Sequence, residues 1–300
     1  MFPIIPANSV TAASGNQEGI FGFGYGPGNV SVSNLVSNAG VIATDTAGVG
    51  TSRNGLDACE YGGDKGIFAF GHDGSGASSI SNLVSNAGVV ASDVTGVGTA
   101  RWYVTACSYG GDKGIFGFGY TGSVRDVTNL VSNAGVVATN TAGVGTARYC
   151  PASCSYGGDK GIFGYGHDGS VHVSMTNLVS NAGVVSSDVT GVGTVRQDLA
   201  ACKYGGDKGI FGFGTGASTV AITNLISNAG VVGTDVTGVG TARYGCRACG
   251  YGGDKGIFAY GYGYGSYQSM SNLVSNTGVV SSDVTGVGTA RADSGACGLN

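Results

Sequence analysis

Residues 204–214 read YGGDKGIFGFG and residues 223–243 read TNLISNAGVVGTDVTGVGTAR, and close copies of this pair recur along the chain. The isoleucine of the first stretch falls at Ile20, Ile67, Ile115, Ile162, Ile210 and Ile257, so the copies are 47 or 48 residues apart. A fixed period of this length is typical of repeat architectures. The chain therefore holds six copies of one structural unit.

Each copy offers four strand-like runs separated by turns. In the fifth copy we expect strand A at 199–204, strand B at 209–214, strand C at 221–227 and strand D from Val231. The intervening Gly-Gly-Asp-Lys and Asn-Ala-Gly sequences predict turns, because Gly, Asn and Asp tolerate positive φ. No apolar pattern of helical period is visible, which argues against helices.

These runs predict an all-β fold, a six-bladed β-propeller with four antiparallel strands per blade. A lead-in of residues 1–17 would precede a single propeller over 18–300, with repeats starting near 18, 59, 107, 154, 202 and 249. The C-terminal strand at 291–300 is expected to complete the first blade and close the ring. The N-terminal run 10–14 is the alternative for that position.

Strand B suggests how the blades stack. Side chains alternate faces along a strand, so Phe116 and Phe118 would share one face and Gly117 and Gly119 the other. The aromatic rings of each blade would then pack on the glycines of its neighbour. The same aromatic pair recurs at Phe21/Phe23, Phe68/Phe70, Phe163/Tyr165, Phe211/Phe213 and Phe258/Tyr260.

The unit resembles the kelch repeat from Glu18 to the C-terminus. An Arg, a small-residue strand, a paired-glycine turn and an apolar strand ending in Gly carry the resemblance, although strand D lacks the Trp and strand B the Gly-Gly of that family. The resemblance implies a propeller. The amino-acid sequence of the repeat also resembles uncharacterised repeat proteins of tailed bacteriophages. This resemblance implies a virion protein, such as a tail component.

Composition limits the possible partners. Of 300 residues, 60 are Gly and only 11% are charged, and the net charge is −4. Outside the repeated positions the chain carries three basic and eight acidic residues. A nucleic-acid binder needs a basic face, so no nucleic-acid partner is expected. No apolar run is long enough to span a membrane, and the N-terminus has no basic region typical of a signal peptide. We expect a virion or extracellular protein without a signal peptide, or otherwise a cytoplasmic one.

The copies differ mainly in two connections. In a four-stranded meander the A–B and C–D turns share one rim of the ring, and these are nearly identical between copies. The B–C and D–A connections share the other rim and vary in sequence. They occupy residues 25–29, 72–77, 120–126, 167–172, 215–219 and 262–268, and residues 54–57, 102–105, 149–152, 197–199, 244–247 and 292–295. A constant scaffold with one varied face is typical of a binding surface, and neutral drift in exposed loops is the alternative.

Aromatic side chains on the variable rim are the candidate binding residues. Tyr and Trp give large contact areas at low entropic cost, and flat rings match the apolar faces of sugars. The predicted ligand-binding residues are Trp102, Tyr103, Tyr120, Tyr149, Tyr244, Tyr262, Tyr264 and Tyr267. Some of these rings could instead fold onto neighbouring loops.

Other candidate chemistry is weaker. Cys59, Cys107, Cys154, Cys202, Cys249 and Cys297 share one position on the predicted inner strand, where packing is favoured over a metal ring. Cys150 and Cys246 are further cysteines on the variable rim, without the second ligand pair that zinc needs. The His-Asp-Gly sequences at 72–74 and 167–169 indicate turns before metal or acid–base chemistry. The Asp repeated at 45, 93, 188, 235 and 283, which is Asn140 in the third copy, is expected to bond a turn or to pair with the Arg eight residues later.

The sequence thus predicts a non-enzymatic recognition module that needs no cofactor and no metal and presents a variable rim to a protein or a cell-surface glycan. A purely structural assembly subunit, docked to other virion subunits through the same rim, is the alternative. A glycan hydrolase is the third reading, with rim carboxylates at Asp57, Asp73, Asp126, Asp168, Asp198 or Asp293.

Overall fold

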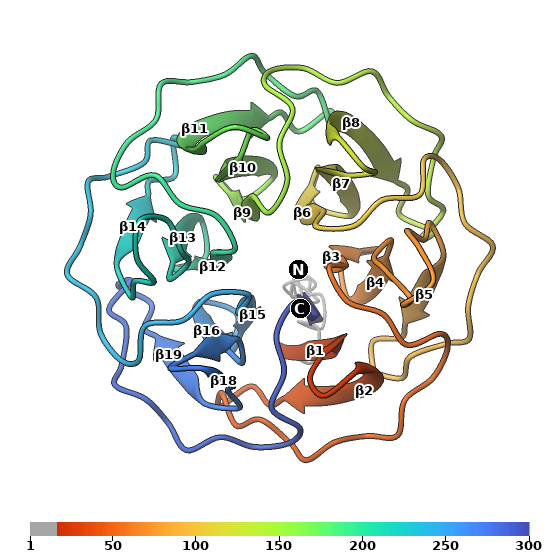
Figure 1. Cartoon of the computed structure of the whole chain (residues 1–300), viewed down its shortest axis with the longest axis horizontal. Helices are drawn as coiled ribbons and strands as arrows, with labels where there is room; N and C mark the ends of the chain where they lie inside the picture. The colour runs from red at the N-terminus through yellow and green to blue at the C-terminus, as the bar shows by residue number, and fades with distance from the viewer. Residues whose placement is uncertain (1–16, 300) are drawn as a thin grey trace, which may run out of the picture.

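The computed structural model describes residues 17–299, and this part is built entirely from β-strands and connections. It contains six three-stranded antiparallel sheets and one two-stranded hairpin. The six larger sheets follow one another around a common centre in chain order (Figure 1).

Every large sheet has an inner, a middle and an outer strand. The inner strands are β20 (Gly295–Leu299), β3 (Asp57–Tyr61), β6 (Thr105–Tyr109), β9 (Ala152–Tyr156), β12 (Ala200–Tyr204) and β15 (Arg247–Tyr251). The middle strands are β1 (Glu18–Tyr25), β4 (Lys65–Ala69), β7 (Lys113–Tyr120), β10 (Lys160–His167), β13 (Lys208–Gly212) and β16 (Lys255–Ala259). The outer strands are β2 (Asn29–Val36), β5 (Ser81–Val84), β8 (Val124–Val131), β11 (His172–Val179), β14 (Thr223–Ile226) and β19 (Ser271–Val274). The small hairpin joins β17 (Tyr262–Gly263) to β18 (Ser266–Tyr267).

The inner strands contact one another in a cyclic order, β20–β3–β6–β9–β12–β15 and back to β20. The first sheet is completed from the far end of the chain, because β20 pairs antiparallel with β1 and places Cys297 opposite Ile20. This is the pairing favoured from the sequence. The alternative run, 10–14, lies outside the described residues.

The expected fourth strand of each unit does not form a continuous strand. In the fifth unit, the segment from Val231 makes only isolated bridges, Ile226 to Val232 and Thr223 to Val236. The Asn224 side chain explains part of this difference, since its Nδ2 donates to Gly233 O at 3.0 Å and to Asp235 Oδ1 at 2.9 Å. Side-chain bonds of this kind compete with a backbone ladder. The outermost segment is therefore held to its sheet by separate backbone bonds, such as Gly233 N to Leu225 O at 2.8 Å, together with these side-chain bonds.

The arrangement of the paired aromatic rings differs from the expectation. The second ring of each pair has positive φ, +64° at Phe213, so strict alternation is interrupted there. Phe211 consequently packs on Tyr165 of the preceding sheet, with ring centroids 5.1 Å apart. Phe213 packs on Phe258 of the following sheet, with centroids 5.2 Å apart. The prediction of one shared face was wrong. Each sheet-to-sheet contact instead receives one ring from either side, in the edge-on geometry that aromatic pairs prefer.

The predicted ring-on-glycine contact is confirmed for the first ring of the pair. A Cβ added to Gly212 would lie 2.8 Å from Phe258 Cζ, so only glycine fits there. The repeated cysteines use a second glycine in the same way. A Cβ on Gly161 would lie 2.6 Å from Cys107 Sγ of the preceding sheet. These cysteines are buried free thiols that pack between sheets.

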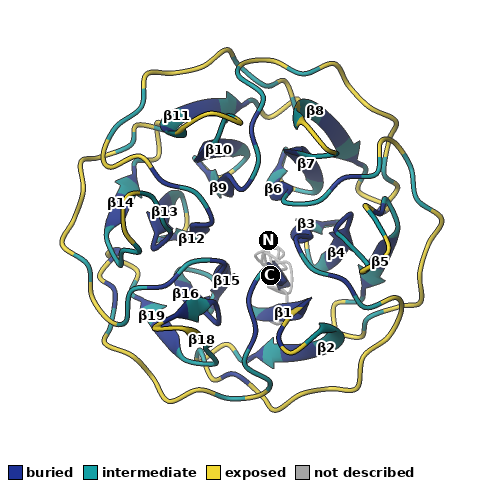
Figure 2. Cartoon of the chain, viewed as in Figure 1, coloured by how far each residue is buried: buried dark blue, intermediate teal, exposed yellow. Residues whose placement is uncertain are grey.

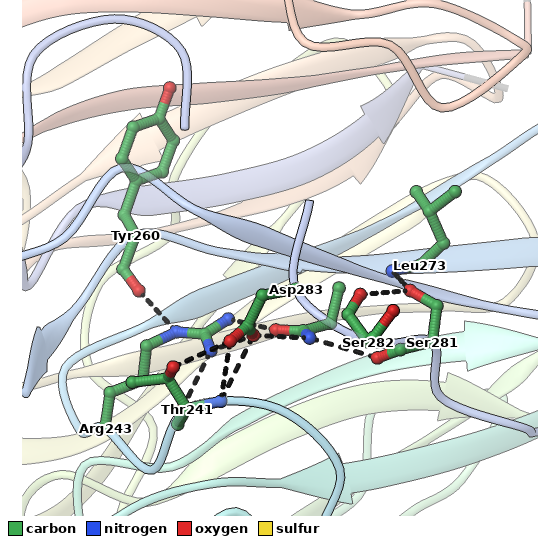
Figure 3. A network of polar contacts seen from close by, with 8 residues as sticks. Thr241, Arg243, Tyr260, Leu273, Ser281, Ser282 and Asp283 are labelled. Carbon is green, nitrogen blue, oxygen red and sulfur yellow. Dashed lines mark hydrogen bonds and ion pairs between the residues drawn. The ribbon is translucent and has the colours of Figure 1, made fainter. Parts of the chain in front are cut away.

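A fully buried arginine links each pair of neighbouring sheets by lying over an aromatic ring of the preceding sheet. Figure 3 shows Arg243 with its polar partners. Arg243 donates from Nε to Tyr260 O at 2.8 Å and from Nη2 to Asn272 Oδ1 at 2.7 Å, and its guanidinium lies 4.1 Å from the centre of the Phe213 ring of the preceding sheet. Asp283 accepts from Thr241 Oγ1 at 2.6 Å and lies 3.9 Å from Arg243 Nη1. We call this repeated arrangement the arginine clamp.

The ion pair in the clamp differs from the one expected from the sequence. Each Asp lies near the Arg of the preceding unit, as Asp93 does with Arg53 at 4.0 Å, and not near the Arg eight residues later. Asp45 of the first unit correspondingly neighbours Arg291 of the last. Its expected turn-bonding role is confirmed by the bonds from Thr51 N and Oγ1 to Asp93. Burial is concentrated on the inner and middle strands, while the perimeter is exposed (Figure 2).

Candidate binding site on the variable rim

The two variable connections of each unit meet as neighbours at one end of the ring. The residue after each clamp arginine forms a bridge with the residue five positions after the repeated isoleucine, as in Trp102 with Tyr120, Tyr149 with His167 and Tyr244 with Tyr262. Most of the predicted binding residues are brought together by these pairings. They form two clusters.

The first aromatic cluster comprises Trp102, Tyr103, Tyr120 and Tyr149, all half-buried. Trp102 stacks on Tyr103 with centroids 4.6 Å apart and lies 6.2 Å from Tyr120. Tyr149 closes the cluster, at 5.6 Å from Tyr120 and 6.0 Å from Tyr103. Because the rings pack on one another, they offer edges and a common surface rather than separate open faces.

Three histidines extend this cluster, although none was among the binding residues predicted from the sequence. His72 lies 4.6 Å from Trp102, His167 lies 5.2 Å from Tyr149, and His172 lies 5.0 Å from His167. A signal was available, because His72 and His167 occupy the repeat position that is Tyr25, Tyr120 or Tyr262 in other copies. The turn interpretation of His-Asp-Gly also holds. His72 Nδ1 accepts from Gly74 N at 3.0 Å, and Asp73 Oδ1 accepts from Ser75 N at 2.8 Å.

The second aromatic cluster lies where the sixth unit meets the first. Tyr262 is 5.6 Å from Tyr244 and 5.1 Å from Tyr267, which is 6.0 Å from Tyr25. Tyr264 belongs to the β17–β18 hairpin turn and is 87% exposed. It is the most exposed of the predicted binding residues.

Between the clusters lies a set of six residues that we call the mouth ring. They precede the inner strands by the same number of positions, and all have φ between +52° and +62°: Gly55, Tyr103, Cys150, Asp198, Gly245 and Asp293. Their backbones are joined in series by N–H···O bonds of 2.8 to 3.1 Å, from Gly245 to Asp198, Asp293 to Gly245, Gly55 to Asp293, Cys150 to Tyr103 and Asp198 to Cys150. Residues of all six inner strands line the channel beyond this ring.

Two carboxylates of the mouth ring lie close together. Gly245 lies between them in the ring: its N–H donates to Asp198 O at 2.8 Å, and a Cβ added to it would lie 2.8 Å from Asp293 Oδ1. Burial, with the neighbouring Asp198, raises the pKa of Asp293 to about 7. Burial also raises the pKa of Asp198. Asp198 Oδ2 accepts from Gln197 Nε2 at 3.1 Å, whereas its Oδ1 is buried without a hydrogen-bond partner among the described residues.

One ion pair lies just inside the channel. Arg247 Nε is 4.0 Å from Asp57 Oδ1, and Asp57 Oδ2 accepts from Ala106 N at 2.9 Å and from Thr105 Oγ1 at 3.3 Å. Burial raises the pKa of Asp57 to about 6. Of the six carboxylates considered for hydrolysis, Asp57, Asp198 and Asp293 therefore converge at the mouth. Asp73, Asp126 and Asp168 remain on the separate B–C connections.

The constant rim has its own polar pair at the opposite channel mouth. Lys203 Nζ of β12 lies 3.4 Å from Glu60 Oε2 of β3, which is on the facing side of the ring (Figure 1). A pocket of about 120 Å³ lies beside this pair and is also lined by Ser108 and Ser155. This contact was not predicted, because the two residues are far apart in the chain and each occurs in only one of the six copies at its repeat position.

Within residues 17–299, no group of three or more His, Cys, Asp or Glu is arranged to hold a metal ion. No helix in that range is long and apolar enough to cross a membrane. The chain matches no protein-family profile, and no curated protein sequence matches it significantly.

Proposed function

We propose that the chain is a six-bladed β-propeller that recognises a carbohydrate on its variable rim, without catalysing a reaction. The cyclic contacts of the inner strands support the propeller, because such contacts leave no sheet at an open end of the series. Each blade then has three regular strands and a fourth segment held by isolated bridges and side-chain bonds.

The main support for recognition on this rim is that the variable connections of neighbouring units form ordered clusters of aromatic rings around one channel mouth. The opposite rim repeats the same turn in copy after copy, with Val41, Val89, Val136, Val184, Val231 and Val279 equally exposed at 64 to 66%. Variation in the connections is thus concentrated on the face where rings and buried carboxylates gather. Drift alone would vary exposed positions on both rims.

The chemistry of this face suits a sugar. Aromatic surfaces bind the apolar faces of pyranose rings, and carboxylates and histidines accept and donate bonds to hydroxyls, in the mixture expected of small-molecule sites. The rings are pre-ordered by their mutual contacts, which lowers the entropic cost of binding.

The test is binding of the purified protein to a glycan array and to whole bacterial cells. We expect binding that falls at least tenfold in a Tyr120→Ala/Tyr264→Ala variant. Val136→Ala, which changes a similarly exposed apolar side chain on the constant rim, is the matched control and should bind normally.

Absence of glycan and cell binding by the unaltered protein would contradict this function. Protein partners captured through the same rim would then favour a structural assembly subunit. Equal loss in the control would show that the binding is not located on the variable rim.

A further inference from the structure

We propose that the mouth ring binds a protonated amine through Asp198 and Asp293, so that the recognised glycan carries a free amino group. This inference deepens the proposed function and rests on it for the identity of the glycan. The amine site itself rests on the geometry of the mouth.

The first argument is an imbalance of charge. Three carboxylates, Asp57, Asp198 and Asp293, face one cation, Arg247, in the electrostatic neighbourhood of the mouth. Arg247 lies nearest to Asp57, which also accepts two hydrogen bonds from β6. The two carboxylates of the mouth ring consequently share whatever charge compensation remains. A cationic ligand would supply it.

The second argument is an unused acceptor. Asp198 is only 9% exposed. Its carboxylate interacts with the Cys150 thiol and accepts from Gln197 Nε2, but Oδ1 has no conventional hydrogen-bond partner among residues 17–299. Most buried polar groups in folded proteins are satisfied, so this acceptor indicates a missing donor.

Aromatic side chains border the carboxylates of the mouth ring. Tyr103 and Tyr149 border the mouth on one side and Tyr244 on the other, and the carboxylates act electrostatically on all three phenols. Burial, with these carboxylates, raises the pKa of Tyr103, so this phenol stays neutral. Carboxylates combined with aromatic rings suit an ammonium group, because the rings add cation–π attraction.

The mouth fits an ammonium better than a metal ion. The described residues contain no metal-type cluster, and the Arg247 guanidinium, which acts electrostatically on both carboxylates, would repel a compact divalent ion more strongly than a single charge. An ammonium donates up to three hydrogen bonds, which suits acceptors on two different segments of the ring.

The main experiment compares two ligands that differ only in the amine. Oligosaccharides of glucosamine and of N-acetylglucosamine, equal in length, are titrated into the protein by calorimetry at pH 8. We expect the free-amine series to bind at least tenfold more tightly. In an Asp198→Asn/Asp293→Asn variant the two series should bind within about twofold of each other. Asp126→Asn removes a rim carboxylate away from the mouth and should keep the preference.

A second probe tests the amine site without any sugar. Propylammonium and propanol have the same carbon chain, and each is titrated into protein with ¹³C-labelled tyrosine rings. We expect propylammonium alone to shift the Tyr103 and Tyr149 signals, and the shift to vanish in the double Asn variant. Unchanged thermal unfolding of that variant would show that the fold is intact.

The outcomes separate the two proposals. No shift with propylammonium and equal binding of both oligosaccharides would overturn the amine site, while leaving carbohydrate recognition in place. A shift with propylammonium but no binding of any glycan would keep the amine site and contradict carbohydrate recognition. Cleavage of the oligosaccharides that stops in the Asn variant would replace the amine site by the hydrolase reading of these carboxylates.

Discussion

The arginine clamp and the mouth ring both bury charge, but they treat it in opposite ways. In the clamp, Arg243 has three hydrogen-bond acceptors, an aromatic face and a nearby Asp283, and the arrangement recurs around the molecule. In the mouth ring, Asp198 and Asp293 occur once, flank Gly245 on either side, act electrostatically on each other and include an unpartnered oxygen. The repeated clamp gives every arginine an aromatic face and hydrogen-bond acceptors, although single nitrogens of Arg101, Arg148 and Arg291 have no partner. The mouth ring, which is not repeated, places carboxylates near one another with few donors. The comparison assigns stability to the first region and recognition to the second.

The largest expected effect comes from breaking one clamp. Arg243→Ala empties a fully buried site and leaves Tyr260 O and Asn272 Oδ1 without their donor, so we expect the free energy of unfolding to fall by about 3–5 kcal/mol. Urea denaturation measures it. Arg125→Ala, on the exposed variable rim, should change stability by about 0.5 kcal/mol or less. A clamp variant as stable as this control would refute the structural role of the clamp.

A smaller loss should follow from filling the glycine beneath a cysteine. Gly161→Ala places a Cβ against Cys107 Sγ at the sheet-to-sheet contact, and overpacking of this kind costs about 1–3 kcal/mol. Cys107→Ala in the same chain vacates that space and should recover most of the loss. A double variant no more stable than Gly161→Ala alone would mean that the thiol is not what excludes a side chain there.

The mouth ring should make stability depend on pH. The folded-state pKa of Asp293 is about 7 and that of Asp57 about 6, both above the unfolded value, so the folded chain binds more protons than the unfolded chain from about pH 4 to 7. Stability should therefore fall as pH rises from 5 to 8, by on the order of 1–2 kcal/mol, since Asp293 is half-buried.

Thermal unfolding at pH 5 and pH 8 measures this dependence. Burial lowers the pKa of His172, which acts in the opposite direction, so the decisive comparison is with Asp293→Asn. The variant should show a flatter profile. An identical slope in both proteins would indicate that Asp293 ionises as freely as in the unfolded chain.

The smallest expected effect is a gain. In the third copy Asn140 replaces the clamp Asp, and there Arg101 Nη2 and Asn129 Oδ1 are both buried without partners. Asn140→Asp restores the charge that the other copies have and should raise unfolding free energy by about 0.5–1 kcal/mol. The reverse change, Asp283→Asn, should cost a similar amount. A destabilised Asn140→Asp would show that the third clamp has adapted to a neutral side chain.

The fold could be predicted from the sequence as far as local patterns determine it. The period, the turn residues and the paired glycines gave the three regular strands of each unit and the packing of Phe258 on Gly212. Two features escaped because one residue overrides a pattern. The positive φ of Phe213 reverses the side-chain alternation, and the side-chain bonds of Asn224 replace a strand ladder.

The site was predictable by residue type but not by arrangement. Exposed Tyr and Trp on variable connections identified both aromatic clusters. The mouth ring was missed because it forms only when units almost fifty residues apart meet, and because its six positions hold four residue types. All six positions have positive φ, which Gly and Asp adopt more readily than most residues. The Gly and Asp residues at 55, 198, 245 and 293 were therefore the available sequence signal.

The pairing of β20 with β1 also has a consequence in time. About 270 residues separate the end of β1 from the start of β20. At the usual rate of about 5–20 residues per second, a ribosome needs roughly 15 to 55 s to make that length. Throughout this interval the inner edge of β1 lacks its partner, and an unpaired edge can join a strand of another chain. Two nascent chains on one messenger are then able to exchange their last strands, so dense loading of ribosomes should yield swapped dimers that sparse initiation avoids.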